Sequence, residues 1–279
     1  MEPVSAADLY LDLMKRVLTR SGFPEPVFVR PSGWKRRLTK PVQDVLGRRG
    51  YALVSGPRAD ASIWSNSFHQ AETMIGLGRL DNVQECVETV ITDGIPGDLI
   101  ETGVWRGGAS IFMRAVLAAY EVTDRIVWAA DSFEGFPTQG SRRHSQDRGT
   151  DFTGGLGAEV LAVDLATVKQ NFARYGLLDD QVRFLAGWFS ETLPIAPIEQ
   201  LAVIRLDGDM YESTWDALDV LYPKLSPGGF VIVDDYRTFA GCREAVDTYR
   251  TQHEITDPIR EIDDHAVYWQ RGPVEAPRP

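Results

Sequence analysis

Four carboxylates follow two apolar runs of the sequence, at 201–206 and 230–233, at the point where each run ends. They are Asp207 and Asp209 after the first run and Asp234 and Asp235 after the second. If the runs are neighbouring parallel strands about 4.8 Å apart, Asp207, Asp234 and Asp235 converge at one sheet edge. Three bare carboxylates repel one another there, and Mg²⁺, which prefers oxygen ligands, would relieve the repulsion. The spacing predicts a magnesium site, with helix capping by Asp207 and Asp234 as the alternative.

A glycine-rich segment follows another apolar run and has the character of a ligand-binding loop. Gly103 to Gly108 reads G-x-x-x-G-G, which differs from the G-x-G-x-x-G of dinucleotide binders. Glu101, just before it, would meet a cationic ligand better than a pyrophosphate. Asp131 ends the next run, 23 positions after Gly108, where a ribose-binding acid is expected. The alternatives are a tight turn at the glycines and capping of the next turn by Asp131 with Ser132.

Strand-like runs alternate with helix-like stretches over most of the chain. The expected strands are 98–102, 125–130, 182–185, 201–206 and 230–233, and the expected helices are near 106–120, 158–175, 212–224 and 241–252. This alternation predicts an α/β fold with a doubly wound, mostly parallel sheet, and residues 255–262 and 265–270 are expected to close it as an antiparallel hairpin. Ligands bind at the carboxyl ends of the strands in such a sheet, which is where the acids and glycines lie.

The N-terminal quarter of the chain differs from the rest. An amphipathic helix is expected over 5–20 and another from about His69 to residue 91, with an irregular, proline-containing stretch at 23–66 between them. We therefore expect an N-terminal extension over 1–66 and one domain over 67–279. The apolar stripes of the two helices favour a homodimer or larger homo-oligomer, and the glycine-rich segment 138–157 is predicted to be a lid or an ordinary loop.

Composition excludes several classes of protein. The chain of 279 residues has 29 Lys and Arg against 40 Asp and Glu, a net charge of −11 that argues against nucleic acid as a partner. No apolar run approaches the roughly 18 residues of a membrane helix, so we expect no membrane association and a cytoplasmic location. Cys86 and Cys242 are expected to be small buried residues rather than a disulfide or metal pair. The four histidines have no interpretable Ser or Cys partner, which argues against nucleophilic catalysis.

Five motifs between about residues 75 and 250 resemble the macrocin O-methyltransferase (TylF-type) family. They are Leu99 to Gly108, Asp131 to Pro137, Gly187 to Phe189, Leu206 to Ser213 and Val233 to Tyr236. The resemblance implies a class I methyltransferase fold that uses S-adenosylmethionine (SAM) and Mg²⁺. It also implies methylation of a deoxysugar hydroxyl on a natural-product glycoside, as in antibiotic biosynthesis.

The resemblance assigns roles to particular residues. The implied cofactor-binding residues are Glu101, Thr102, Gly103, Asp131, Ser132, Gly187, Trp188, Phe189 and Asp207. Asp207, Asp234 and Asp235 would ligate Mg²⁺, and Asp209 would be the general base. Three alternatives stay open: a catechol-type O-methyltransferase acting on a vicinal diphenol, an NAD-dependent Rossmann oxidoreductase, and a catalytically silent SAM-binding scaffold.

Overall fold

In the described part of the chain, the sheet has seven strands and is parallel except at one edge. The computed structural model describes residues 5–22, 33–48, 71–138, 143–153 and 158–273. The strands are β1 (Asp98–Thr102), β2 (Val127–Asp131), β3 (Val182–Ala186), β4 (Leu201–Leu206), β5 (Leu225–Val233), β6 (Arg260–Glu261) and β7 (Val267–Gln270). Their order is β3-β2-β1-β4-β5-β7-β6, and β7 runs antiparallel to both β5 and β6. This confirms the expected doubly wound sheet with a closing hairpin.

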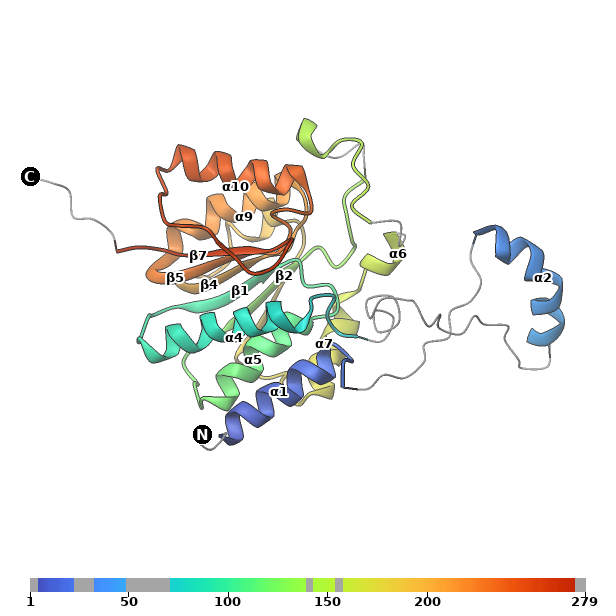
Figure 1. Cartoon of the computed structure of the whole chain (residues 1–279), viewed down its shortest axis with the longest axis horizontal. Helices are drawn as coiled ribbons and strands as arrows, with labels where there is room; N and C mark the ends of the chain where they lie inside the picture. Colours follow the sequence, from blue (N-terminus) through green and yellow to red (C-terminus); the bar gives the residue numbers. More distant parts are fainter. Residues whose placement is uncertain (1–4, 23–32, 49–70, 139–142, 154–157, 274–279) are drawn as a thin grey trace, which may run out of the picture.

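Helices cover both faces of the sheet (Figure 1). One face carries α4 (Leu77–Thr92), α5 (Gly108–Ala119) and α7 (Leu165–Arg174), with α1 (Ala6–Leu18) packed against α4 and α5. The other face carries α9 (Tyr211–Leu221) and α10 (Ala240–Gln252). The shorter elements among the described residues are α6 (Ala158–Leu161), α8 (Phe189–Thr192) and the 3₁₀ turns η2 (Ser145–Asp147) and η3 (Tyr222–Lys224).

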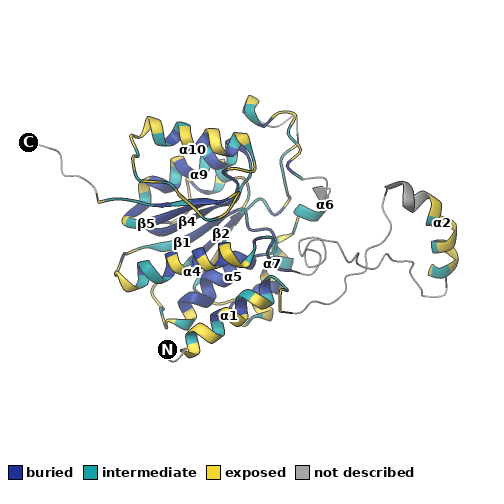
Figure 2. Ribbon diagram, in the orientation of Figure 1, coloured by how far each residue is buried: buried dark blue, intermediate teal, exposed yellow. Residues whose placement is uncertain are grey.

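The central strands are buried on both faces, as a parallel sheet covered by helices requires. All six residues of β4 are buried, and the strand interiors are dark in Figure 2. Leu99 of β1 packs in the core beneath α4 and α5, whereas Ile100 packs in the core beneath α9 and α10. This alternation follows from the period of two along a strand. The two cysteines are buried and free, as expected.

The N-terminal part departs from the sequence-based expectation in two places. The stretch 23–66 was expected to be irregular, which is wrong for α2 (Gly33–Gly47), a helix that lies apart from the other elements in Figure 1. Its proline, Pro41, lacks one N–H group without ending the helix, and Leu38, Val42 and Val45 keep the three-and-four spacing.

The helix expected from about His69 begins only at Leu77, and His69 itself lies outside the described residues. The preceding backbone pairs with other elements instead: Glu72 N donates to Leu18 O (3.0 Å) and Gly108 N to Glu72 O (2.9 Å). The expected domain boundary after residue 66 also lies outside the described residues.

The helix expected at 158–175 is divided into α6 and α7. Asp164 caps the second helix by accepting a hydrogen bond from the backbone N–H of Thr167 (2.9 Å). Within the described part of the chain, no helix combines the length and the apolar character that crossing a bilayer demands.

Candidate active site

The carboxyl ends of β1, β4 and β5 meet at one edge of the sheet. The strand ladders continue into the following loops, with Asp207 N donating to Thr102 O (2.8 Å) and Asp234 N donating to Leu206 O (2.9 Å). The chain leaves β1 towards β2 on one side, while β4 and β5 lie on the other, so this edge is a topological switch point. The structure therefore brings the glycine-rich loop and the acidic loops together, as the strand order requires.

Gly103 is the residue that lets the first loop approach the fourth strand. Its φ is +90°, and a Cβ atom there would overlap the carbonyl oxygen of Asp207. A side chain would therefore be strained twice, by the left-handed backbone conformation and by the overlap. The glycine is required by the close approach of two loops that both line the site.

Replacing Gly103 with alanine is expected to lower the free energy of unfolding by about 2 to 5 kcal/mol, measured by urea denaturation. The matched control is Gly94→Ala, because Gly94 also has a positive φ (+65°) but has open space around the position of a Cβ. The control is expected to cost only about 1 to 2 kcal/mol, from backbone conformation alone. Equal losses in the two variants would mean that the overlap with Asp207 does not matter.

The predicted metal ligands form a compact cluster. Carboxylate oxygens of Asp207, Asp234 and Asp235 lie within 4.8 Å of one another. Asp235 Oδ2 is buried and has no hydrogen-bond partner among the described residues. Burial raises the pKa of the Asp235 carboxyl, and Asp209, held at a φ of +61°, is close enough for its negative charge to raise that pKa further. An unpartnered carboxylate oxygen inside a group of acids suits a hard divalent cation.

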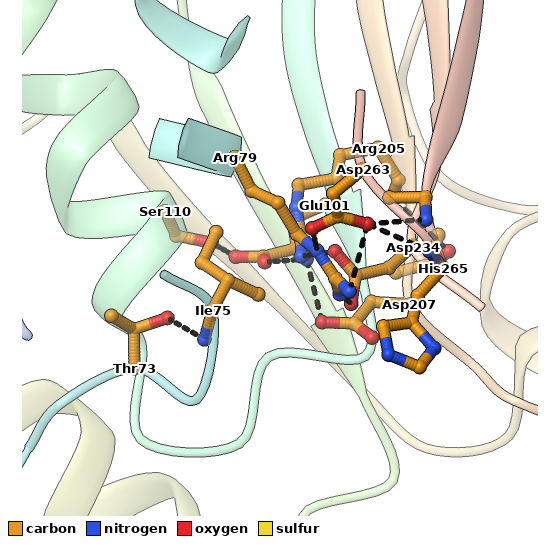
Figure 3. Close-up of polar contacts among 12 residues, drawn as sticks. Thr73, Ile75, Arg79, Glu101, Ser110, Arg205, Asp207, Asp234, Asp263 and His265 are labelled. Atoms are coloured by element: carbon orange, nitrogen blue, oxygen red, sulfur yellow. Dashed lines mark hydrogen bonds and ion pairs between the residues drawn. The ribbon is translucent and has the colours of Figure 1, made fainter. Parts of the chain in front are cut away.

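Two arginines partly neutralise the cluster, and the sequence analysis did not anticipate either. Arg205 of β4 bonds to Glu101 Oε1 and Asp207 Oδ2 (2.6 Å each) and also to Asp234. Arg79 of α4 reaches Asp234 (Figure 3). A signal existed in the sequence, because an arginine inside the buried run 201–206 requires nearby counter-charges.

The register of the sheet explains how these charges meet. Glu101 and Arg205 are cross-strand partners in β1 and β4. Both side chains point towards the face that carries α4 and α5, and these helices supply Arg79 and Ser110 (Figure 3). Ser110 donates its hydroxyl to Glu101. The result is one polar network that links the glycine-rich loop to the acidic loops.

Burial dominates the protonation of this network. It raises the pKa of Glu101 to about 7, against the opposing effects of Arg205 and the Ser110 hydrogen bond. Burial and the neighbouring carboxylates also hold the pKa values of Asp209 and Asp235 well above their usual range. The free energy of the ionised cluster is therefore high, and added positive charge would lower it.

A cavity of about 810 Å³ lies over this edge of the sheet. Seven of the nine predicted cofactor-binding residues line it, namely Gly103, Asp131, Ser132, Gly187, Trp188, Phe189 and Asp207. The other two, Glu101 and Thr102, are buried (2% and 1% exposed) and do not line the cavity. Glu101 instead lies beneath it, against Arg205. Asp209, Asp234 and Asp235 line the same cavity, so the predicted base and metal ligands share one space with the predicted cofactor residues.

Asp131 fixes two loops of the cavity wall. Its carboxylate accepts hydrogen bonds from the backbone N–H of Val104 (2.6 Å) and of Phe133 (2.8 Å). The second bond, with a longer one from the Ser132 hydroxyl (3.4 Å), is the local turn capping considered as the alternative. Asp131 does both, because it also lines the cavity.

Helix capping by Asp207 and Asp234, the other alternative, is wrong. The N-cap residue of α9 is Met210 and that of α10 is Phe239, so neither acid stands at a helix start.

The cavity is also lined by residues that the sequence analysis did not assign to the site. They are Met74, Ile75, Phe152, Thr238, Phe239 and His265. The imidazole Nδ1 of His265 lies 3.2 Å from the hydroxyl oxygen of Thr238. Residues 143–153, part of the expected lid, lie against α9 and α10; residues 139–142 and 154–157 of that segment are outside the described residues. No local pattern marks these residues, since they meet only through the fold.

Comparison with known proteins identifies the family. The family model for macrocin-O-methyltransferase (TylF) matches residues 7–271. The 8-demethyl-8-(2,3-dimethoxy-alpha-L-rhamnosyl)-tetracenomycin-C 4'-O-methyltransferase of Streptomyces olivaceus is 53% identical over 272 residues, covering 97% of this chain and 95% of the relative. The mycinamicin III 3''-O-methyltransferase of Micromonospora griseorubida is 48% identical over 272 residues, covering 98% and 100% of the two chains.

Solved structures are also similar to this chain. The O-methyltransferase NovP aligns with a TM-score of 0.78 at 46% identity, covering 96% of this chain and 100% of NovP. The calicheamicin methyltransferase CalS11 aligns with a TM-score of 0.52 at 19% identity, covering 91% and 97%, which shows the shared fold alone. The fold is that of class I SAM-dependent methyltransferases. The match argues against the NAD-dependent oxidoreductase alternative and extends the resemblance beyond residues 75–250. The chain thus belongs to the macrocin-O-methyltransferase (TylF) family and is an O-methyltransferase.

Proposed function

We propose that this enzyme transfers the methyl group of SAM to a hydroxyl of a deoxysugar carried by a natural-product glycoside, in an Mg²⁺-dependent reaction. The observation that carries the proposal is the single cavity in which Asp207, Asp209, Asp234 and Asp235 lie beside the glycine-rich loop. Two relatives support the substrate class, because their names specify a rhamnosyl-tetracenomycin and mycinamicin III.

The donor end of the cavity suits SAM. Asp131 would accept hydrogen bonds from ribose hydroxyls, and Trp188 and Phe189, which line the same cavity, would supply apolar surface for the adenine. Gly103 and Gly187 also line the cavity and would lie near the bound cofactor. The positive sulfonium of SAM is complementary to the surplus negative charge of the carboxylate cluster. Glu101, which is paired with Arg205, would add its negative charge to this electrostatic potential from beneath the cavity.

The cluster suits Mg²⁺ as well. Asp207, Asp234 and Asp235 would hold the ion, and the unpartnered oxygen of Asp235 is the feature of this structure that favours it. A divalent cation at this place supplies positive charge that lowers the pKa of a neighbouring hydroxyl. Arg79 and Arg205 both bond to Asp234 and would hold its carboxylate in place, whereas Asp235 keeps an unpartnered oxygen in the cavity wall.

The reaction itself needs positioning and one proton transfer. The acceptor oxygen would form a bond to the methyl carbon of SAM as the carbon–sulfur bond breaks, and the electron pair of the broken bond would stay on sulfur. Asp209 would take the hydroxyl proton, since its carboxylate lines the cavity beside the metal ligands. Arg79 of α4, Phe239 before α10 and Phe152 line the cavity and would exclude water from the reacting atoms.

Calorimetric titration of the EDTA-stripped protein with SAM and with NAD, each with and without Mg²⁺, tests the cofactor. SAM is expected to bind and NAD is not, because the glycine spacing does not fit a dinucleotide. Binding of NAD without SAM would contradict the proposal.

Methyl transfer to deoxysugar glycosides and to vicinal diphenols is then compared, with and without EDTA. Transfer to the glycosides that EDTA abolishes is the expected result. A preference for diphenols would support the catechol-type alternative, and no transfer to any acceptor would support the silent scaffold. Full activity in EDTA would remove the role of the metal.

We also propose that the enzyme is a homodimer or larger homo-oligomer. Apolar side chains remain exposed on two helices, among them Leu9 (62%) and Leu13 (55%) of α1 and Leu38 (70%) of α2. Burying them against a second copy would remove apolar surface from water. Light scattering after size-exclusion chromatography is expected to give at least twice the monomer mass, and a monomer at micromolar concentration would contradict the proposal.

A further inference from the structure

We infer that Asp147 is a positioning residue, which fastens residues 143–153 to the first turn of α9 and so shapes the acceptor end of the active site. The inference rests on the proposed function for the identity of the acceptor. Asp147 is fully buried in η2, although it lies in a segment rich in polar and charged residues. A buried acid needs partners, and this one finds them 64 residues further along the chain.

The carboxylate of Asp147 takes the place of an N-cap. Its Oδ1 accepts a hydrogen bond from Tyr211 N (2.7 Å), and its Oδ2 accepts one from Glu212 N (2.9 Å). The N-cap residue of the helix is Met210, whose side chain has no oxygen to accept hydrogen bonds from the first N–H groups. An acid from outside the helix therefore satisfies two N–H groups and lies at the positive end of the helix dipole.

The same helix start holds the catalytic loop. Residues 207–210 connect β4 to α9, and Ser213 of the first turn donates its hydroxyl to Gly208 O (2.6 Å). The proposed base Asp209 lies in this loop with a positive φ. Fixing the first turn of α9 thus restricts the loop that carries the base.

Further contacts also hold residues 143–153 against the start of α9. The backbone N–H of Arg143 donates to Glu212 (2.7 Å), and the ring of His144 lies 4.9 Å from that of Tyr211. Gly241 of α10 leaves room for the carboxylate, because a Cβ there would lie only 3.2 Å from Asp147 Oδ1. The anchor is thus enclosed by α9 and α10 together.

Near its C-terminal end, the same segment contributes an aromatic side chain to the cavity wall. Phe152 is 6% exposed, and its ring centroid lies 5.0 Å from that of Phe239 and 5.6 Å from that of Phe136. The three rings form a continuous apolar wall of the cavity. Such a wall suits the C–H face of a deoxysugar or an apolar aglycone next to it. By fastening the segment that carries Phe152, Asp147 would keep this ring in the wall.

Asp147→Asn and Asp147→Ala test the inference, with Asp164→Asn as the matched control. Asp164 also caps a helix, α7, and does not line the cavity. For both Asp147 variants we expect kcat/KM for the glycoside to fall at least tenfold, with the dissociation constant of SAM, measured by calorimetry, within threefold of wild type. Trypsin is expected to cleave after Arg143 or Arg148 at least tenfold faster, because the segment is released from α9. The control is expected to stay within twofold of wild type in all three measurements.

Three results would overturn the inference: unchanged kcat/KM with unchanged cleavage, an equal loss of SAM and acceptor affinity, or equal losses in the Asp164 control. The first result would show that Asp147 does not hold the segment, and the other two would show that Asp147 stabilises the fold in general. If the wild-type enzyme methylates no glycoside, the proposed function fails. Tryptic cleavage then still decides whether Asp147 holds the segment.

Discussion

Replacing Asp209 with asparagine is expected to lower kcat by about a hundredfold to ten-thousandfold, the range typical for the loss of a general base. Asparagine has nearly the shape of aspartate but cannot accept the proton of the acceptor hydroxyl. The backbone at this position has a φ of +61°, which asparagine tolerates as well as aspartate does. The loop should therefore keep its conformation, and the loss should be confined to the proton transfer.

The measurement is steady-state kinetics with saturating SAM and Mg²⁺, combined with calorimetric titration of both ligands. Asp264→Asn is the control, since Asp264 is an exposed acid on the turn between β6 and β7 and does not line the cavity. A loss smaller than tenfold in Asp209→Asn would leave the general-base role without support. Loss of Mg²⁺ binding in parallel with kcat would instead make Asp209 part of the metal site.

Replacing Arg205 with methionine is expected to lower the free energy of unfolding by about 3 to 5 kcal/mol, as the removal of one partner of a buried ion pair does. The guanidinium is 1% exposed and pairs with Glu101, Asp207 and Asp234. Without it, these carboxylates lose their central positive charge. Methionine retains much of the volume of the arginine stem, so packing losses should be small.

Urea denaturation in EDTA at neutral pH measures the effect. The control is Arg114→Met on α5, because the partner of Arg114, Asp179, has a side chain that is 40% exposed. Water can compensate that acid, so the control is expected to cost about 1 kcal/mol or less. Similar losses in the two variants would show that the stability of the fold does not depend on neutralising the acidic edge.

The positions of the acids could be predicted from the sequence because they depend on local order. Asp131, Asp207 and Asp234 each follow a run of buried, strand-forming residues, and parallel strands end at the same edge of a sheet. The strand order then brings these strand ends together, and this can be predicted without knowing the side-chain contacts. The same reasoning succeeded for the closing hairpin, where the partners are close in the sequence.

The expectations failed where distant or non-local contacts decide. Residues 71–76 continue the apolar spacing of α4, yet they bond to α1 and to the glycine-rich loop instead of forming a helical turn. In α2 the proline suggested an irregular chain, because local propensity disfavours proline inside a helix. In both places, the local sequence pattern alone did not determine where the helix lies.

The sequence by itself determined the α/β alternation, the strand ends and the identity of the groups that stand there, because period and turn chemistry act over a few residues. Only the tertiary structure decided which charges neutralise which. Arg205 meets Glu101 from a strand 104 residues away, and Asp147 meets Tyr211 across 64 residues. Electrostatic and hydrogen-bond energies depend on distance in space, and that distance is set only when the strands and helices have packed together.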